Sequence, residues 1–263
     1  MKELSLDQIR EVQLNILRKV HDFCIENNIR YSLGGGTLLG AVRHQGYIPW
    51  DDDIDIMMPR ADYDRFVELF SGSSDQYICA CYENDPNYQY PFVKICDNRT
   101  QLKEEGIVDN IAVNIDLFPI DGLPSGKREI RSHVRAVHHA WRWVRRKNRE
   151  IVKGRHSLLQ RIVVAIIRRI PNSYFQEKIK ALCYKYDYDK CQMAGAILGT
   201  YGMREVYSKE LFESYTTLPF EGMELCSIAD FDTYLSQHYG SYMELPPQEQ
   251  QVRRHKVRAY ALE

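Results

Sequence analysis

Apolar positions at the start of the chain recur every three or four residues, as on one face of an amphipathic helix. They are Leu6, Ile9, Val12, Ile16, Val20 and Phe23. Ser5 and Gln8 have the types and the spacing of a capping box. Together these features predict a helix over residues 5–28 that faces the core.

The next segment indicates a short strand, a glycine turn and a second helix. Residues 29–33 have the pattern of a strand, which the triple glycine 34–36 interrupts. Thr37 is expected to cap a short helix over residues 38–46, because its hydroxyl can accept a free amide of the first turn. Residues 54–58 then alternate as a strand.

Further alternation predicts an α+β fold built on a mixed or antiparallel sheet. A helix over residues 60–70 follows Pro59, and residues 158–170 and 174–187 indicate two more helices around Pro171. The carboxyl-terminal third is expected to mix short helices and loops. The successive strands of the sheet are predicted over residues 76–83, 90–97, 100–105 and 113–121.

The composition is typical of a soluble globular protein. The 263 residues are 44% hydrophobic, the amino terminus has no apolar signal-peptide core, and no run of about 18 apolar residues occurs. Seven irregularly spaced cysteines are typical of reduced thiols in a cytoplasmic protein. Cys79 and Cys81 have the spacing of half a zinc site, but no second pair with ligand spacing follows.

Charge is distributed unevenly along the chain. Residues 127–169 contain fourteen Lys or Arg and two acids, so this segment is about +12 and the remainder about −13. Such a segment favours a partner that is a polyanion or a membrane surface. Nucleic acid is not favoured, because no recognised nucleic-acid-binding module accompanies the charge.

Four aspartates lie within five positions, at Asp51, Asp52, Asp53 and Asp55. Side chains alternate between the faces of a strand, so Asp53 and Asp55 are expected to share one face, with isoleucines on the other. Such a carboxylate pair suits Mg²⁺, which prefers oxygen ligands and leaves room for substrate phosphates. Asp51 and Asp52 are expected in the preceding loop, and a solvated acidic turn is the alternative for the whole run.

The triple glycine 34–36 and Asp116 also fit a site that binds phosphate and a metal ion. Glycines before a helix let backbone amides approach a phosphate, although a structural turn uses the same residues. Asp116 lies among apolar residues on a predicted strand, where an unpaired charge is costly. A metal shared with Asp53 and Asp55 would give Asp116 a partner.

This combination resembles the nucleotidyltransferase fold superfamily, in which divalent cations bind between three carboxylates. Residues 34–66, "GGGTLLGAVRHQGYIPWDDDIDIMMPRADYDRF", resemble the signature of the LicD family. "IDLFPIDGLP" resembles its second block, and "LPFEGMELCSIADFDTYLSQHYGSYMELPP" with His255 downstream resembles its last block. The basic segment is the least typical part of the match.

The resemblance implies a phosphotransferase that moves phosphocholine from CDP-choline to a sugar hydroxyl and releases CMP, with Mg²⁺ or Mn²⁺. The acceptor would be a cell-surface glycan precursor, as of lipopolysaccharide or teichoic acid, and other relatives use CDP-alcohols such as CDP-ribitol. The family's acids fall on Asp53, Asp55 and Asp116. Ala229 and Ser241 depart from the expected proline and acid, which puts the acceptor contacts in doubt.

The resemblance also implies substrate-binding residues. Gly35, Gly36 and Thr37 would bring amides and a hydroxyl to the donor diphosphate. Arg43 would reach a phosphate oxygen, or is a surface arginine. Trp50 would stack on a base or a quaternary ammonium, or packs the loop.

Three further assignments complete the predicted site. Lys94 is expected to point into a cleft toward the donor phosphates, or out to solvent. His255 would complete the site from the tail, or is an exposed basic residue. For the choline group, Tyr88, Tyr90 and Phe92 precede Lys94, but their spacing does not distinguish them from core residues.

The expected organisation has three parts. We predict a nucleotidyltransferase-like catalytic core over residues 1–125, a basic helical subdomain over 126–190, and a carboxyl-terminal part over 191–263 that completes the core and the acceptor side. The basic helices would contact a membrane with lipid-linked acceptors at its inner face, bind an anionic glycan, or be a cationic face in solvent or an oligomer. A nucleotidyltransferase that uses an NTP and an inactive binding relative are the alternative functions.

Overall fold

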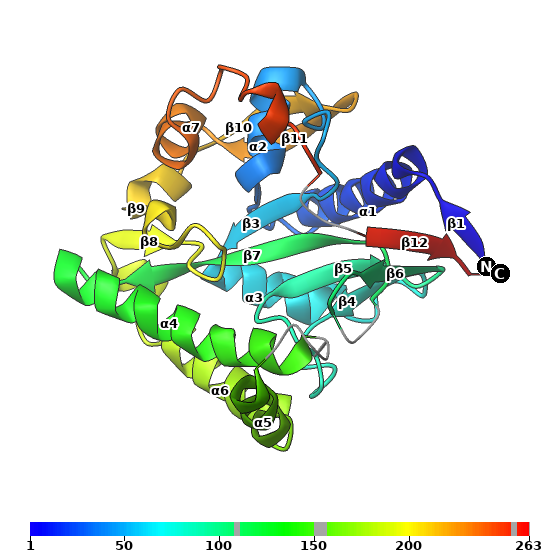
Figure 1. Cartoon of the computed structure of the whole chain (residues 1–263). Helices are drawn as coiled ribbons and strands as arrows, with labels where there is room; N and C mark the ends of the chain where they lie inside the picture. The colour runs from blue at the N-terminus through cyan, green and yellow to red at the C-terminus, as the bar shows by residue number, and fades with distance from the viewer. Residues whose placement is uncertain (108–110, 150–156, 254–256, 263) are drawn as a thin grey trace.

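The computed structural model describes residues 1–107, 111–149, 157–253 and 257–262. The fold is α+β around a mixed seven-stranded sheet, which confirms the predicted class (Figure 1). Strands β3 and β7 are parallel, and the other neighbours pair antiparallel. The strands in spatial order are β2 (Ser32–Leu33), β3 (Asp55–Pro59), β7 (Asn114–Leu123), β5 (Val93–Asp97) and β4 (Tyr77–Ala80), with β8 (Met193–Gly195) beside β7 and β9 (Val206–Ser208) beside β8.

Two helices cover one face of this sheet. They are α1 (Leu6–Glu26) and α3 (Arg60–Phe70) (Figure 1). Phe23 of α1 packs edge-on against Phe66 and Phe70 of α3, at ring-centroid distances of 5.7 and 5.0 Å. The predicted capping box is confirmed, because the Ser5 side chain and amide exchange hydrogen bonds with Gln8. The apolar alternation of β3 and β7 buries Ile56 and Leu117 against this layer, which leaves the polar positions on the opposite face.

The glycine turn differs from its prediction. Helix α2 (Gly35–His44) begins before Thr37, and its amino-terminal cap is Gly34. Thr37 therefore lies inside the first turn, and the expectation that it caps the helix was wrong. The reason is that Gly35 adopts φ +49°, a left-handed conformation that lets the chain turn directly from β2 into the helix.

A second sheet joins the two ends of the chain. It consists of β1 (Lys2–Leu4), β12 (Val257–Ala261) and β6 (Thr100–Glu104), all antiparallel. The prediction placed residues 100–105 in the main sheet, and this was wrong. The cause is a long-range pairing: Leu102 and Ala259 are direct partners, and both are buried with Ile9 and Val113.

The described parts of residues 126–190 are predominantly helical, as predicted. They contain α4 (Lys127–Asn148), α5 (Leu158–Ile167) and α6 (Asn172–Cys183). Helix α4 buries Val137 and Trp141 in a cluster that includes Ile179 of α6 and Phe92, which directly precedes β5. The proposed division of the chain at residues 125 and 190 stays a prediction.

The carboxyl-terminal third contains more strand than predicted. Besides β8, β9 and β12, it has the hairpin of β10 (Tyr215–Phe220) and β11 (Met223–Ile228), followed by α7 (Phe231–Tyr239). The hairpin turn, Glu221–Gly222, has φ values of +49° and +76°, the two-residue geometry that matches strand twist. Short 3₁₀ helices complete the chain: η1 (Tyr188–Lys190), η2 (Gly202–Glu205), η3 (Lys209–Phe212) and η4 (Gln248–Gln250).

Candidate active site

Three neighbouring strands bring together charged side chains that are far apart in the sequence. Asp55 of β3 and Asp116 of β7 are direct partners across the parallel pair. Lys94 of β5 is the direct partner of Asp116 on its other side. The three residues thus form a row across the sheet, on the face that α1 and α3 leave uncovered. The sequence placed each on a strand, but the register that aligns them could not be predicted from it.

A cavity of about 990 Å³ lies over this row. Its lining includes seven of the ten residues predicted as catalytic or substrate-binding: Gly35, Gly36, Arg43, Trp50, Asp53, Asp55 and Asp116. Within the described part of the chain, Thr37 and Lys94 are not among its lining residues. His255 lies outside the described residues.

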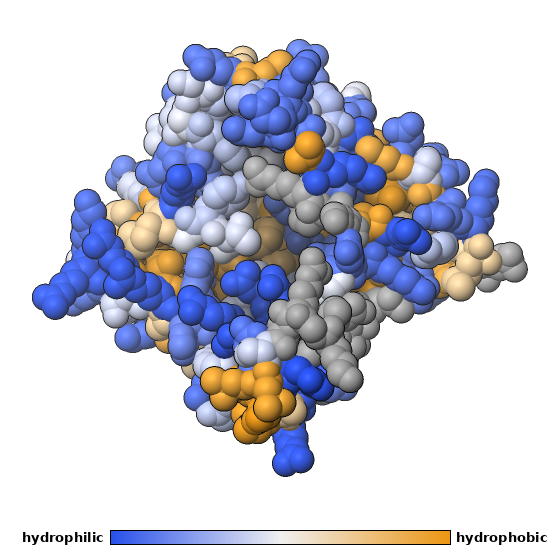
Figure 2. Space-filling model, viewed as in Figure 1, coloured by the Kyte–Doolittle hydropathy of each residue, from blue (hydrophilic) through white to orange (hydrophobic). Residues whose placement is uncertain are grey.

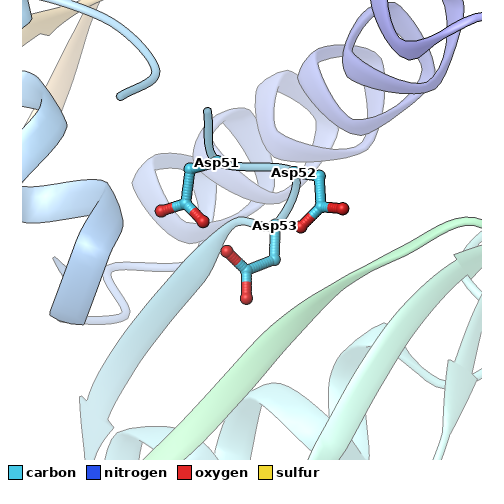
Figure 3. Close-up of side chains that lie close together, drawn as sticks. All are labelled: Asp51, Asp52 and Asp53. Carbon is cyan, nitrogen blue, oxygen red and sulfur yellow. The ribbon is translucent and has the colours of Figure 1, made fainter. Parts of the chain in front are cut away.

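Every second residue of the aspartate run lines the cavity, including two residues that precede strand β3. Strand β3 begins only at Asp55, so Asp53 lies before it, which differs from the expectation of a strand pair. Asp51, Asp53 and Asp55 are nonetheless all half-buried and line the cavity, whereas Asp52 is buried and 3.5 Å from the guanidinium of Arg253. Figure 3 shows the side chains of Asp51 and Asp52 on the same side of the segment that carries them, with the carboxylate of Asp53 between and below them.

The sequence analysis placed Asp51 in the loop with Asp52, which the structure confirms, but it did not include Asp51 among the residues of the site. Carboxylate oxygens of Asp51, Asp52 and Asp53 lie within 4.8 Å of one another. The signal that could have identified Asp51 is the same alternation, continued one step toward the amino terminus. Side chains of α1 hold the backbone here: the Arg10 guanidinium donates to the Asp51 carbonyl at 2.6 Å, and the Gln13 amide donates to the Asp52 carbonyl at 3.0 Å.

The glycine turn is fastened to the aspartates through the backbone. The Gly34 amide donates to the carbonyl of Asp55 at 2.9 Å, and the Asp55 amide donates to the Thr37 hydroxyl at 2.8 Å. A Cβ atom at Gly35 would lie 3.1 Å from Oδ2 of Asp55, and one at Gly36 would lie 2.7 Å from Oδ2 of Asp51. The glycines are thus needed for this close approach, and Thr37 fixes the position of Asp55.

Electrostatics distinguish the two central carboxylates. Burial raises the pKa of Asp55 well above its ordinary value, and the negative charges of Asp53, Asp116 and Asp51 raise it further. The Lys94 ammonium is hydrogen-bonded to the carboxylate of Asp116, and it donates to Asn114 at 3.1 Å. Burial lowers the pKa of Lys94, but Asp116, Tyr90 and Cys96 together raise it, and the net change is upward. Asp116 is therefore directly compensated, whereas carboxylates surround Asp55.

Arg43 and Trp50 line the cavity from α2 and from the segment before the aspartates. The Arg43 guanidinium donates to the carbonyls of Tyr242 at 2.7 Å and Glu244 at 3.2 Å. Burial lowers the pKa of Arg43. Arg43 therefore holds the carboxyl-terminal segment against the cavity. Trp50 is half-buried against the main core, so it combines packing with an exposed part at the site.

The carboxyl-terminal part lines the cavity with tyrosines that the sequence analysis did not single out. The Tyr234 hydroxyl of α7 accepts a hydrogen bond from the Gly35 amide at 3.2 Å. Tyr239 lies edge-on to Tyr201, and their hydroxyls are 3.2 Å apart. Burial raises the pKa of Tyr239, as do Tyr201 and, more weakly, the charge of Asp55. These tyrosines were missed because only the three-dimensional pairing distinguishes them among 18 tyrosines.

The three aromatic residues before Lys94 have different positions. Phe92 lines the cavity and packs against Phe118 at a centroid distance of 4.3 Å. The ring of Tyr90 lies 4.6 Å from the Lys94 ammonium. Tyr88 is buried and donates to the carbonyl of Phe92. Of the three, Phe92 is thus the one that lines the cavity, although little of its surface is accessible.

Comparisons with known proteins match the region of the aspartates and also the whole chain. Residues 28–121 match the family described as LicD/FKTN/FKRP, nucleotidyltransferase domain, and this range contains Asp51, Asp53, Asp55, Lys94 and Asp116. The chain is 34% identical over 277 residues to the lipopolysaccharide cholinephosphotransferase LicD of Haemophilus influenzae, covering 100% of both chains.

Two uncharacterised Rickettsia proteins match over shorter stretches. RT0683 of Rickettsia typhi is 44% identical over 68 residues, which is 26% of this chain and 20% of that protein. RP689 of Rickettsia prowazekii is 48% identical over 61 residues, which is 23% of this chain and 20% of that protein. The end-to-end similarity to the Haemophilus phosphotransferase agrees with the expected enzyme class. It also confirms the resemblance inferred from the sequence blocks: the chain belongs to the LicD family.

Proposed function

We propose that this protein transfers phosphocholine from CDP-choline to a sugar hydroxyl of a cell-surface glycan precursor, as of lipopolysaccharide. The observation that carries the proposal is the set of four carboxylates, Asp51, Asp53, Asp55 and Asp116, around one cavity. It occurs in a chain that aligns from end to end with a lipopolysaccharide cholinephosphotransferase. Transfer needs a cation to neutralise the phosphate charge and a base to deprotonate the hydroxyl. Clustered carboxylates suit both needs, because they can hold a divalent cation and accept a proton.

The carboxylates fit a divalent cation, Mg²⁺ or Mn²⁺. All donors are oxygens, and Asp55 is held among negative neighbours that raise its pKa. We propose Asp51, Asp53, Asp55 and Asp116 as the ligands, and we leave Asp52 out because it is buried beside Arg253. When bound, the cation would neutralise these charges and polarise the donor phosphates.

The remaining chemistry is assigned to residues of the chain. The sugar oxygen forms a bond to the phosphorus that carries choline, and the bond from that phosphorus to the CMP oxygen breaks with its electrons. Asp116 would orient the hydroxyl and accept its proton. Lys94 would hold the Asp116 carboxylate in place, and its predicted contact with the donor phosphates is the alternative role for the same ammonium.

The donor and acceptor would bind on opposite sides of the aspartates. The amides of Gly36 and Thr37 belong to the first turn of α2, which suits the donor diphosphate. Trp50, Phe92 and Phe118 supply aromatic surface for the quaternary ammonium. The segment that Arg43 holds would face the acceptor. We further propose a nucleotidyltransferase-like core and a cytoplasmic reaction at the inner face of a membrane.

Product identity tests this proposal. The protein is incubated with Mg²⁺ and either CDP-choline or CTP, together with lipopolysaccharide that lacks phosphocholine. CMP release that depends on CDP-choline and the acceptor supports the proposal. Pyrophosphate release from CTP would show that the protein is a nucleotidyltransferase instead, and binding of CDP-choline without turnover would indicate an inactive relative.

A second experiment identifies the alcohol of the donor. It compares the thermal shifts that CDP-choline, CDP-ribitol, CDP-glycerol and CDP-ethanolamine produce.

A further inference from the structure

We infer that the outer side of α5 is a docking surface for a membrane that contains anionic lipids. Four large apolar side chains of this helix expose between 48% and 71% of their surface: Leu158, Leu159, Ile162 and Ile166. With about 3.6 residues per turn, these four fall on one side of the helix. Val164 and Ile167, which are buried, fall on the opposite side.

Helix α5 is thus apolar on two sides, and the fold uses only one. Ile167 packs in the cluster that contains Trp141 of α4 and Ile179 of α6. The Arg168 guanidinium adds hydrogen bonds to the carbonyls of Lys147 and Arg149 at 3.2 and 2.9 Å. The inner side and Arg168 therefore anchor the helix, and the outer apolar residues contribute little to folding.

Figure 2 shows where this surface lies. Apolar residues gather over α5 at the lower edge of the view, on the same face that is hollowed near its centre. None of the described helices is long and apolar enough to cross a bilayer. A short helix with one embedded side suits contact at the level of the lipid head groups.

The charged residues near the exposed apolar side chains of α5 indicate which kind of partner this helix contacts. No Asp or Glu occurs between Glu150 and Glu177. Arg161 and Arg169 are exposed on α5 and just after it, and Arg146 is exposed on the neighbouring α4. Apolar side chains beside arginines match a bilayer with anionic head groups, because the side chains enter the apolar layer while the guanidinium groups meet phosphates.

A second copy of the chain is the main rival for this surface. In a two-fold contact, the same patch meets itself, so the arginines of one copy would face those of the other. This stretch offers no acid to pair with them. The charge therefore favours lipid over self-association.

Vesicle flotation tests the inference with the full-length protein and without donor or acceptor, so the result is independent of the proposed reaction. We expect binding to phosphatidylcholine vesicles that contain phosphatidylglycerol, weaker binding to phosphatidylcholine alone, and loss of binding at high salt. Ile162→Asp with Ile166→Asp should weaken binding more than about tenfold. Replacing Arg161 and Arg169 with Gln should weaken it about fivefold for each arginine.

Ile25→Asp is the matched control, because Ile25 on α1 is 59% exposed and Ile166 is 58% exposed. It should leave vesicle binding unchanged, and thermal melting should confirm that all variants fold. The inference is overturned if the wild-type protein does not float with anionic vesicles, or if Ile25→Asp weakens flotation as much as the α5 double change. It is also overturned if light scattering shows a dimer that the α5 change converts to a monomer while flotation persists.

Discussion

Asp55 and Asp116 lie opposite each other on the parallel strands β3 and β7, and both line the same cavity. Their environments are unequal. Lys94 binds Asp116 directly, whereas burial and the charges of Asp53, Asp116 and Asp51 raise the pKa of Asp55. Among the described side chains, Lys94 supplies positive charge at the Asp116 end of the pair, so the Asp55 end is arranged for a further cation.

Asp55→Asn tests this imbalance. Removing the carboxylate relieves repulsion, so the free energy of unfolding without metal should rise by about 1–2 kcal/mol. The same change should lower transfer by at least about 100-fold and remove the stabilisation by Mg²⁺. Thermal melting with and without Mg²⁺ measures both effects. A variant that still melts higher with Mg²⁺ and still transfers phosphocholine would contradict the role of Asp55.

A scan of the aspartate run tests the alternation. Asn at Asp51 or Asp53 should lower transfer and weaken the Mg²⁺ response, because both line the cavity. Asn at Asp52 should keep transfer within about threefold and lower stability by about 1 kcal/mol, since it weakens the contact with Arg253. Equal losses at all four positions would indicate a general acidic patch instead of a defined ligand set.

Lys94→Met tests the compensation of Asp116. The change leaves a half-buried carboxylate without its direct partner, so we expect a loss of about 3 kcal/mol of stability and reduced transfer. Lys180→Met is the matched control, because Lys180 pairs with Glu83 at 2.9 Å on the exposed surface. That change should cost less than about 1 kcal/mol. If the two changes lower the melting temperature equally, the pair of Lys94 and Asp116 contributes no more to stability than an exposed ion pair.

Gly35→Ala tests the close approach of α2 to the aspartates. Gly72→Ala is its control, since both glycines have positive φ, but a Cβ atom at Gly72 meets nothing within 4 Å. Both changes should destabilise the fold by about 1–2 kcal/mol through backbone strain. Gly35→Ala alone should lower transfer, by about 10- to 100-fold, because it displaces Asp55. Comparable transfer by the two variants would show that the approach is not needed.

The pH dependence follows from the raised pKa of Asp55. The folded protein binds this proton more tightly than the unfolded chain, in which the ordinary value of 3.8 applies. Without metal, the stability contributed by Asp55 is therefore present at low pH and is lost as pH rises through the folded pKa. Mg²⁺ affinity should change in the opposite direction, because the cation needs the ionised carboxylate. Melting temperatures across pH, with Asp55→Asn as the flat reference, measure both trends.

Local patterns predicted much of this structure. The capping box of Ser5 and Gln8 and the helices of the basic segment depend on neighbouring residues, so the sequence identifies them directly. The hairpin turn at Glu221–Gly222 was also local but was overlooked, because Glu is an uncommon residue at positive φ.

Long-range features could not be predicted in the same way. The pairing of Leu102 with Ala259 joins residues at distant positions, and the alignment of Lys94 with Asp116 depends on strand register. Periodicity selected Asp53 and Asp55 but stopped at the expected strand boundary, so it missed Asp51. Thr37 had the right type for a cap, but the conformation of Gly35 started the helix earlier.

The most direct test follows two labels from one donor. CDP-choline labelled separately in the choline methyl groups and in the cytidine ring is incubated with the protein, Mg²⁺ and lipopolysaccharide that lacks phosphocholine. The account predicts that the choline label moves to the glycan and that an equal amount of the cytidine label appears as CMP, with neither change for Asp55→Asn. Cytidine label on the glycan, or choline transfer that persists in Asp55→Asn, would contradict it.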